Sequence, residues 1–253
     1  AQAPWKPRIN ALVASSSHIT GHTAPVMKLA VSLDQSFFVS CSHDGTCRVW
    51  ETPQVEDSPG SLESNIVYSG HSEKRTTRIN DVAMVEGSHS IVSGSSESVH
   101  VWRVDMVAPS KTSFSQSEPK RNYDRSRVIG TSTIREVDPA EGEVLAVSHF
   151  NSPAASVITF ATQKGSVHSW DLRCAREPFV LKHGPDLGHL TSVALGNDRQ
   201  WIVTGTSRGY LALWDVRFQQ AVKLWRHSRE APITSLAASL VPPPQNWGPR
   251  AAA

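Results

Sequence analysis

Cysteine is scarce in this chain. Its 253 residues include only Cys41, Cys47 and Cys174, and no two of them form a CxxC pair. An odd number of cysteines without that spacing argues against a disulfide framework and against a zinc site. Cys41 and Cys47 flank a predicted hairpin turn. We therefore expect two reduced thiols close together, acting as small apolar residues of a sheet.

The chain also lacks long apolar runs and an excess of charge of one sign. No stretch reaches the length of a membrane span, and no basic leader precedes an apolar core. The formal net charge is +2 and the basic residues are scattered, which argues against a nucleic-acid binder. We expect a soluble, cytoplasmic protein that binds no nucleic acid and does not insert directly into membranes.

Motifs of catalysis and cofactor binding are missing too. The chain has no GxSxG elbow, no phosphate-binding glycine loop and no HExxH. Its 11 histidines show no metal-ligand spacing with a nearby acid. We therefore expect no catalytic residues, no metal, no cofactor and no enzyme activity within this chain.

What the chain does contain is a repeated strand–turn–strand segment that ends in tryptophan. The copies read VSCSHDGTCRVWE (39–51), IVSGSSESVHVWR (91–103), TFATQKGSVHSWD (159–171) and VTGTSRGYLALWD (203–215). A unit of this kind that recurs about every 40–45 residues is typical of WD repeats, and longer spacings indicate insertions. The predicted fold is all-β: an incomplete WD40-repeat β-propeller of about four blades plus the start of a fifth.

Short runs rich in Val, Ile, Thr and aromatic residues mark the strands. We predict strands at 26–32, 37–42, 46–51 and 65–70 in blade one, 78–85, 89–95 and 98–104 in blade two, 143–150, 156–162, 166–172 and 178–183 in blade three, 190–196, 201–207, 210–216 and 221–227 in blade four, and 233–239 at the start of blade five.

Two polar segments interrupt this pattern, at about 52–64 and 105–127, and both are expected to be loops between the third and outer strands of their blades. Residues 1–253 are expected to form a single propeller region. Because the chain begins at Ala1 rather than methionine and stops early in a fifth blade, we expect a fragment of a longer protein.

The repeats resemble the WD family in a polar network. That family links a histidine before the inner strand, a Ser or Thr of the second strand, an aspartate of the turn and the tryptophan of the third strand. A buried indole N–H and a buried carboxylate both need such partners. Lys164 and Arg208 replace the aspartate in blades three and four, which should depend more on packing. The residues assigned to the network are His22, Ser40, Asp44 and Trp50 in blade one, His71, Ser93 and Trp102 in blade two, Trp170 and Asp171 in blade three, and Thr204, Trp214 and Asp215 in blade four.

A sharper resemblance rests on more than the generic repeat residues. The chain opens with WKPR (5–8), and blade three carries HFNS (149–152) and WDLR (170–173), followed by WDVRF (214–218) in blade four. In these motifs and their order the chain resembles the C-terminal propeller of the regulatory, protein kinase-like subunit of the class III phosphatidylinositol 3-kinase complex. The resemblance implies a non-catalytic scaffold in endosomal and vacuolar protein sorting and in autophagy.

The same resemblance implies partners and a location. The partners would be the lipid kinase catalytic subunit, Beclin-type coiled-coil subunits and endosomal small GTPases. The protein would be cytoplasmic and bound peripherally, through the complex, to endosomal and autophagic membranes. The serine/threonine protein kinase-like domain of the family would lie outside these residues.

Arg173 and Arg217 support an alternative. They complete two WDxR motifs, which resemble those by which WD proteins dock as substrate receptors on a cullin ubiquitin ligase. They are therefore the candidate partner contacts, although each could instead pair with an acid or a carbonyl of a neighbouring blade. A generic WD scaffold with unrelated partners is the third reading.

Overall fold

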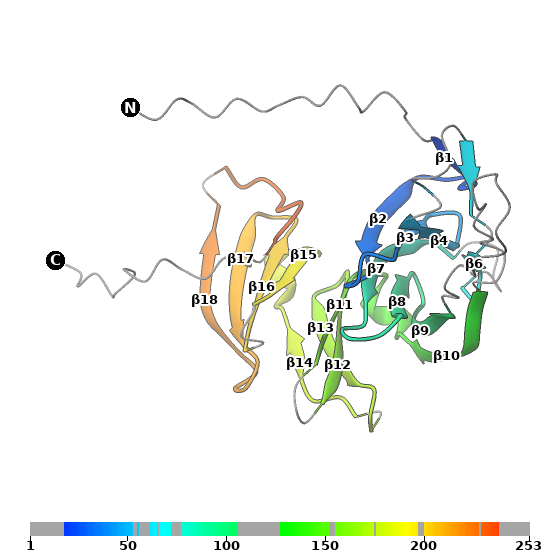
Figure 1. The fold of residues 1–253 in the computed structure, drawn as a ribbon. Coiled ribbons are helices and arrows are strands. Elements are labelled where there is room, and N and C mark those ends of the chain that lie inside the picture. Colours follow the sequence, from blue (N-terminus) through cyan, green and yellow to red (C-terminus); the bar gives the residue numbers. More distant parts are fainter. Residues whose placement is uncertain are drawn as a thin grey trace, which may run out of the picture.

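Four antiparallel sheets of four strands each make up most of the structure, a computed structural model of the chain (Figure 1). Each sheet is one blade, and the blades follow one another in chain order. The structure describes residues 18–52, 55, 61–64, 66–71, 77–105, 127–151, 155–174, 176–196, 200–227 and 229–237.

The strands of each blade follow one another in chain order from the inner to the outer strand, except that β5 (Ser61–Glu63) lies between the third and outer strands of blade one without joining its sheet. They are β2 (Val26–Val31), β3 (Phe37–Ser42), β4 (Cys47–Glu51) and β6 (Ile66–Tyr68) in blade one, β7 (Ile79–Met84), β8 (Ser90–Ser95), β9 (Ser98–Asp105) and β10 (Arg127–Glu136) in blade two, β11 (Val144–Asn151), β12 (Ser156–Thr162), β13 (Ser166–Asp171) and β14 (Val180–Lys182) in blade three, and β15 (Leu190–Leu195), β16 (Trp201–Thr206), β17 (Tyr210–Asp215) and β18 (Gln220–Arg226) in blade four.

The turn between the second and third strands has one geometry in three blades. Gly45, Gly165 and Gly209 have φ values of 82°, 112° and 76°, in the left-handed region that favours glycine. The N–H of each glycine donates to the carbonyl oxygen three residues earlier, at 3.2, 3.2 and 3.1 Å. Residues that precede these glycines therefore occupy equivalent positions, which allows the blades to be compared residue by residue.

Apolar side chains lie between neighbouring blades, where the tryptophans of blades two, three and four pack back against the preceding blade. Trp102 of blade two joins Phe37, Val39 and other residues of blade one. Trp170 lies in a cluster with Val92 and Val99 of blade two, and Trp214 packs with residues of blade three that include Val167 and Leu181. The hydrophobic core is thus a series of layers between sheets.

A buried carboxylate ties three inner strands together. Asp81 of β7 is 4% exposed, and its Oδ1 lies 3.1 Å from Lys28 Nζ of β2. Its Oδ2 accepts a hydrogen bond of 2.8 Å from the backbone N–H of Val147 in β11. Burial raises the pKa of Asp81, so the lysine and backbone contacts are needed to offset the loss of solvation.

The structure departs from the predicted strands in three places. β10, the outer strand of blade two, was not predicted, and it begins at Arg127, the last residue of the expected loop. The segment 52–64 is not entirely loop, because β5 (Ser61–Glu63) pairs in parallel with β1 (His18–Thr20). The described part of 233–239, residues 233–237, forms no strand, although Ile233 N–H donates to Thr206 O at 3.1 Å.

The two ends of this array present apolar side chains to solvent. On β2, Met27, Leu29 and Val31 are 45%, 57% and 59% exposed, and on β18, Val222 and Leu224 are 58% and 48% exposed. Among the described residues no helix is long and apolar enough to cross a membrane.

Most of the interruption at 105–127, residues 106–126, lies outside the described residues. Its two ends are close, because Asp105 and Arg127 are paired across the β9–β10 ladder. We predict that replacing 106–126 by Asn-Gly leaves the melting temperature within about 2 °C of the parent, since this dipeptide suits a two-residue hairpin and little core should be lost. A drop of 10 °C or more in a thermal melt followed by circular dichroism would show that the segment packs against the blades.

Candidate functional site

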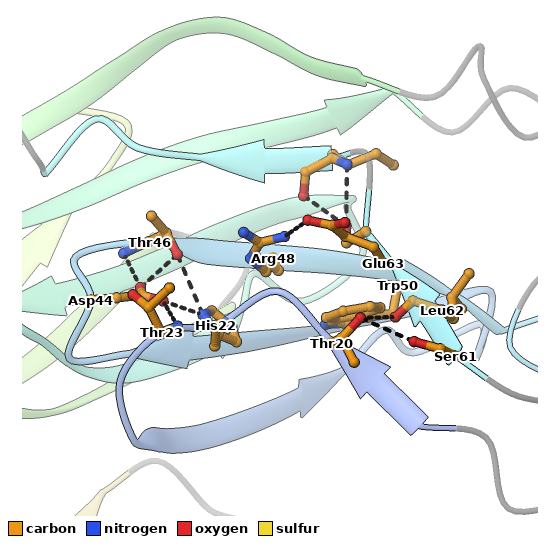
Figure 2. A network of polar contacts seen from close by, with 12 residues as sticks. Thr20, His22, Thr23, Asp44, Thr46, Arg48, Trp50, Ser61, Leu62 and Glu63 are labelled. Atoms are coloured by element: carbon orange, nitrogen blue, oxygen red, sulfur yellow. Dashed lines mark hydrogen bonds and ion pairs between the residues drawn. The ribbon is translucent and has the colours of Figure 1, made fainter.

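Blade one contains a continuous hydrogen-bond chain from its tryptophan to its turn, and Figure 2 shows the part of it around His22, Asp44 and Thr46. The indole N–H of Trp50 donates to Ser40 Oγ at 2.9 Å, and Ser40 Oγ lies 2.8 Å from His22 Nε2. His22 Nδ1 lies 2.8 Å from Asp44 Oδ2. With the Ser40 hydroxyl donating to Nε2, Nδ1–H donates to the carboxylate, and every polar group in the chain is satisfied.

Asp44 completes this network because its carboxylate accepts several hydrogen bonds at once. Thr23 N–H donates to Oδ2 at 3.0 Å, while Thr46 N–H and Oγ1–H donate to Oδ1 at 2.9 and 2.6 Å. Burial alone would raise the pKa of Asp44, but the bonds from Thr46, His22 and Thr23 outweigh it and lower the pKa to about 2. The turn aspartate is therefore a carboxylate at neutral pH.

The glycine before His22 has a backbone conformation that other residues rarely adopt. Gly21 has a φ of 127°, and a Cβ added there would lie 2.3 Å from Arg48 Nη1. Arg48 is directed on toward Glu63, with 3.7 Å between Nη1 and Oε1 (Figure 2).

Blade two keeps the hydroxyl and the histidine but not the acid. Trp102 N–H donates to Ser93 Oγ at 3.1 Å, and Ser93 Oγ lies 2.8 Å from His71 Nε2. His71 Nδ1 is buried and has no hydrogen-bond partner. The His71 ring instead stacks on His100 at 3.6 Å between centroids, and Tyr68 Oη lies 2.7 Å from His100 Nδ1.

Blade three has replaced the network altogether. Phe160 occupies the strand position held by Ser40, Ser93 and Thr204, so Trp170 finds no hydroxyl there and is buried among apolar side chains. His168 stacks on Phe160 at 5.0 Å, and its two ring nitrogens each lie 2.6 Å from a carboxylate oxygen, of Glu141 and Glu177. The sequence analysis missed this cluster, although a phenylalanine at the hydroxyl position was a visible signal.

Blade four again lacks the acid. Trp214 N–H donates to Thr204 Oγ1 at 2.9 Å, and Thr204 Oγ1 lies 2.5 Å from His183 Nε2. His183 Nδ1 is buried without a hydrogen-bond partner. Arg208 occupies the turn position that Asp44 holds in blade one. Its Nη1 donates to the backbone carbonyl oxygen of Asp186 at 2.8 Å.

The carboxylates that follow two of the tryptophans close the next turn rather than join the network. Asp171 Oδ1 accepts from Arg173 N–H at 3.0 Å, and Asp215 Oδ1 accepts from Arg217 N–H at 2.9 Å. The hydrogen bonds to Arg173 and Arg217, respectively, are the main causes that lower the pKa of each acid. Asp171 and Asp215 thus lie at strand ends, away from the histidines.

The WDxR arginine of blade four is held by its own blade. Arg217 Nη2 lies 2.7 Å from Asp215 Oδ2, and Nε donates to Oδ1 at 3.1 Å. In this ion pair the arginine and its carboxylate belong to the same blade, and not to two neighbouring blades. The Arg217 side chain is 54% exposed and could also reach a partner.

Two of the three cysteines are buried. Cys41 and Cys47 face each other across β3 and β4 as buried free thiols, and burial raises the pKa of Cys41 to about 12. Among the residues that the structure describes, no group of three or more His, Cys, Asp or Glu could hold a metal ion. A cavity of about 420 Å³ opens between the inner strands and is lined by Lys28, Asp81 and neutral side chains such as Val147 and Thr191.

Loss of the blade-one tryptophan should unfold the blade. We predict that Trp50→Ala lowers the free energy of unfolding by about 3–5 kcal/mol, as for other large aromatic side chains removed from cores. Trp50→Phe, which removes mainly the N–H donor, should cost about 1 kcal/mol. Urea unfolding at pH 7 measures both, and a Trp50→Ala variant as stable as the parent would show that Trp50 does not anchor the blade.

The buried histidines should make the protein sensitive to acid. Burial lowers the pKa of His71 to about 3 and that of His183 to about 4, against about 6.5 in an unfolded chain. Below pH 6.5 the unfolded chain therefore binds more protons, and the free energy of unfolding should fall as the pH falls toward 4. We predict that His71→Gln is less stable at pH 7 but loses less stability between pH 6.5 and 4, as measured by urea unfolding across this range. An unchanged pH slope would contradict the assignment.

Comparison with known proteins identifies the kind of repeat that this chain contains. The model of the WD domain, G-beta repeat, matches residues 13–51, and that of the nucleolar protein 10-like N-terminal domain matches 131–242. The WD40 repeats of RRP9, a solved structure, align with a TM-score of 0.57 at 18% identity and cover 82% of this chain and 51% of that chain. These likenesses confirm the predicted WD propeller fold.

Two relatives are similar over most of the sequence. The probable serine/threonine-protein kinase vps15 of Dictyostelium discoideum is 33% identical over 216 residues, which cover 85% of this chain and 10% of that protein. Serine/threonine-protein kinase VPS15 of Arabidopsis thaliana is 30% identical over 242 residues, or 94% of this chain and 15% of that protein. The chain thus spans a small part of the length of these kinases, and no catalytic domain is evident in its described residues. It is a WD-repeat propeller region that fits the propeller of the VPS15 kinases.

Proposed function

We propose that this chain is the non-catalytic interaction scaffold of the regulatory subunit of a class III phosphatidylinositol 3-kinase complex. The observation that carries the proposal is the similarity to VPS15 kinases over 85–94% of the chain. The described histidines, hydroxyls and tryptophans of the repeats are engaged in holding blades together. Loops and sheet edges are left for partners.

The partners in this proposal are the lipid kinase catalytic subunit, Beclin-type coiled-coil subunits and endosomal small GTPases. The scaffold acts in endosomal and vacuolar sorting and in autophagy, and it is cytoplasmic and peripheral on endosomal and autophagic membranes through the complex. Support comes from the Lys28–Asp81–Val147 tie, which joins the inner strands of three blades, since a surface that is already ordered loses little conformational freedom on binding.

A substrate receptor of a cullin ubiquitin ligase is the second candidate. It is favoured by the half-exposed guanidinium of Arg217, which the Asp215 carboxylate holds in a fixed orientation beside Trp201 at 6.0 Å. A generic WD scaffold with unrelated partners is the third candidate, and it would bind neither the lipid kinase subunits nor the cullin adaptor.

Affinity capture with the tagged chain separates these readings. We predict that the lipid kinase catalytic subunit and a Beclin-type subunit are recovered, and that Arg217→Ala does not change their yield. Lys223→Ala, on the exposed strand β18, is the matched control for loss of one surface cation. Recovery of the cullin adaptor without the lipid kinase, with loss of the adaptor on Arg217→Ala, would overturn the proposal.

A further inference from the structure

The outer strand of blade four is a long sheet edge. β18 has seven residues, all of them exposed, and it is the terminal strand of its sheet (Figure 1). The outer strands of blades one and three, β6 and β14, have three residues each, and the longer β10 is interrupted in its pairing with β9 between Ile129 and Thr133. An edge such as β18 presents a row of backbone N–H and C=O groups with which another strand can pair.

A further blade beside blade four would not cover this edge. Blades two and three each have a neighbouring blade on both sides, and their outer strands β10 and β14 are still the terminal strands of their sheets. The edges of outer strands therefore stay accessible when blades pack face to face. The edge of β18 remains open whatever packs against the far face of blade four.

Apolar side chains beside this edge are also left uncovered by the blade that is present. Leu224 is paired with Ala212, which is buried in the layer shared with blade three, so both side chains lie on the face toward blade three. Leu224 is nevertheless 48% exposed, and Val222, at the bulge in the β17–β18 ladder, is 58% exposed. An added strand would find apolar surface to contact on this face.

Positive charge is concentrated around β18. Residues 208–230 contain five Arg or Lys residues and two acids, whereas the net charge of the whole chain is +2. Both acids are paired with an arginine of the same segment. Lys223 Nζ lies 5.7 Å from the centre of the Trp225 ring, and the Arg226 guanidinium lies 5.0 Å from that of the Tyr210 ring. The surroundings of the edge are therefore complementary to negative charge.

The same charges argue against a second copy of this chain as the occupant. Two β18 edges side by side would bring Lys223 and Arg226 of one copy close to those of the other, and like charges opposite each other in a ladder are destabilising. Natural sheets use lysine on exposed edges to prevent such pairing. An acidic strand would meet opposite charges instead.

We propose that β18 binds an extended, acidic segment of a partner protein, which adds to the edge of blade four as a fifth strand. Backbone hydrogen bonds would supply affinity, and the cations beside the edge would select a segment rich in Asp and Glu. Alternate side chains of the added strand would lie beside Leu224 on one face and beside Lys223 on the other. The inference rests on the proposed protein-binding function and names one surface and the chemistry of what it binds.

A peptide titration tests the site. Fluorescence polarisation of a labelled eight-residue peptide of alternating Val and Glu is measured against the full chain, with a peptide of alternating Val and Lys as the charge-reversed control. We expect saturable binding of the Val/Glu peptide and at least about tenfold weaker binding of the Val/Lys peptide. Equal binding of the two peptides, or binding of phosphatidylserine vesicles without the Val/Glu peptide, would overturn the proposal.

Hydrogen–deuterium exchange shows whether the bound peptide pairs with the edge. The backbone N–H groups of β18 should exchange more slowly with the Val/Glu peptide bound, because those directed away from β17 gain acceptors. Protection elsewhere in the chain without protection of β18 would contradict strand addition. So would protection of β18 in the absence of peptide in a chain that sediments as a dimer, since a second copy would then occupy the edge.

Lys223→Glu gives the sharper result, because it reverses one charge beside the edge and leaves the apolar surface in place. We expect about fivefold weaker binding of the Val/Glu peptide and stronger binding of the Val/Lys peptide, an exchange that loss of structure would not produce. Arg103→Glu makes the same change of charge on the exposed side of β9 and should alter neither affinity. An unchanged preference between the peptides in Lys223→Glu would refute the site.

The affinity capture described above reports on the proposed complex, and the titration reports on this edge. Lys223→Ala serves in both measurements. Unchanged recovery of the lipid kinase catalytic subunit together with weaker peptide binding would keep the complex and assign β18 to another partner. Recovery of the cullin adaptor without the lipid kinase, with peptide binding intact, would overturn the proposed function and keep the site.

Discussion

The need of a buried indole N–H for an acceptor governs the arrangement of these blades. Trp50, Trp102 and Trp214 each lie nearly out of contact with water, and each donates to a hydroxyl of the neighbouring strand. That hydroxyl also lies within hydrogen-bond distance of a histidine ring nitrogen, which fixes the position of the segment leading into the inner strand. A single donor therefore determines how strand, turn and entering segment lie relative to one another.

Much of the fold follows from local sequence, because alternating β-rich runs, turn glycines and terminal tryptophans are visible without any contact map. β10 was missed since its sequence, RVIGTSTIRE, follows a long polar stretch and carries its own glycine. The blade-one site was predicted from the family pattern. The unpartnered nitrogens of His71 and His183 were not, because only distances in three dimensions show what is absent around them. The His168 cluster escaped for a related reason: Arg135, which pairs with Glu177, comes from the preceding blade.

The blades also differ in a way that bears on function. Blade one satisfies its own polar chain, blade three has exchanged it for a histidine between two glutamates, and blade four leaves one imidazole nitrogen of His183 without a partner. Positions that depart from a repeat pattern are those where selection for structure alone is relaxed or opposed. The resemblance to VPS15 kinases depends in part on such positions in blades three and four.

The tryptophan layers between blades follow the order of the chain. Trp102, Trp170 and Trp214 each pack on the blade before them, and His183 and His227 donate their backbone N–H groups to Gly165 and Gly209 of the preceding turns, both at 2.8 Å. A ribosome releases the N-terminal blade first, so every later blade meets a finished surface as it emerges. Assembly can then proceed by addition to a growing end, with no early blade left waiting for a distant partner to form its tryptophan layer.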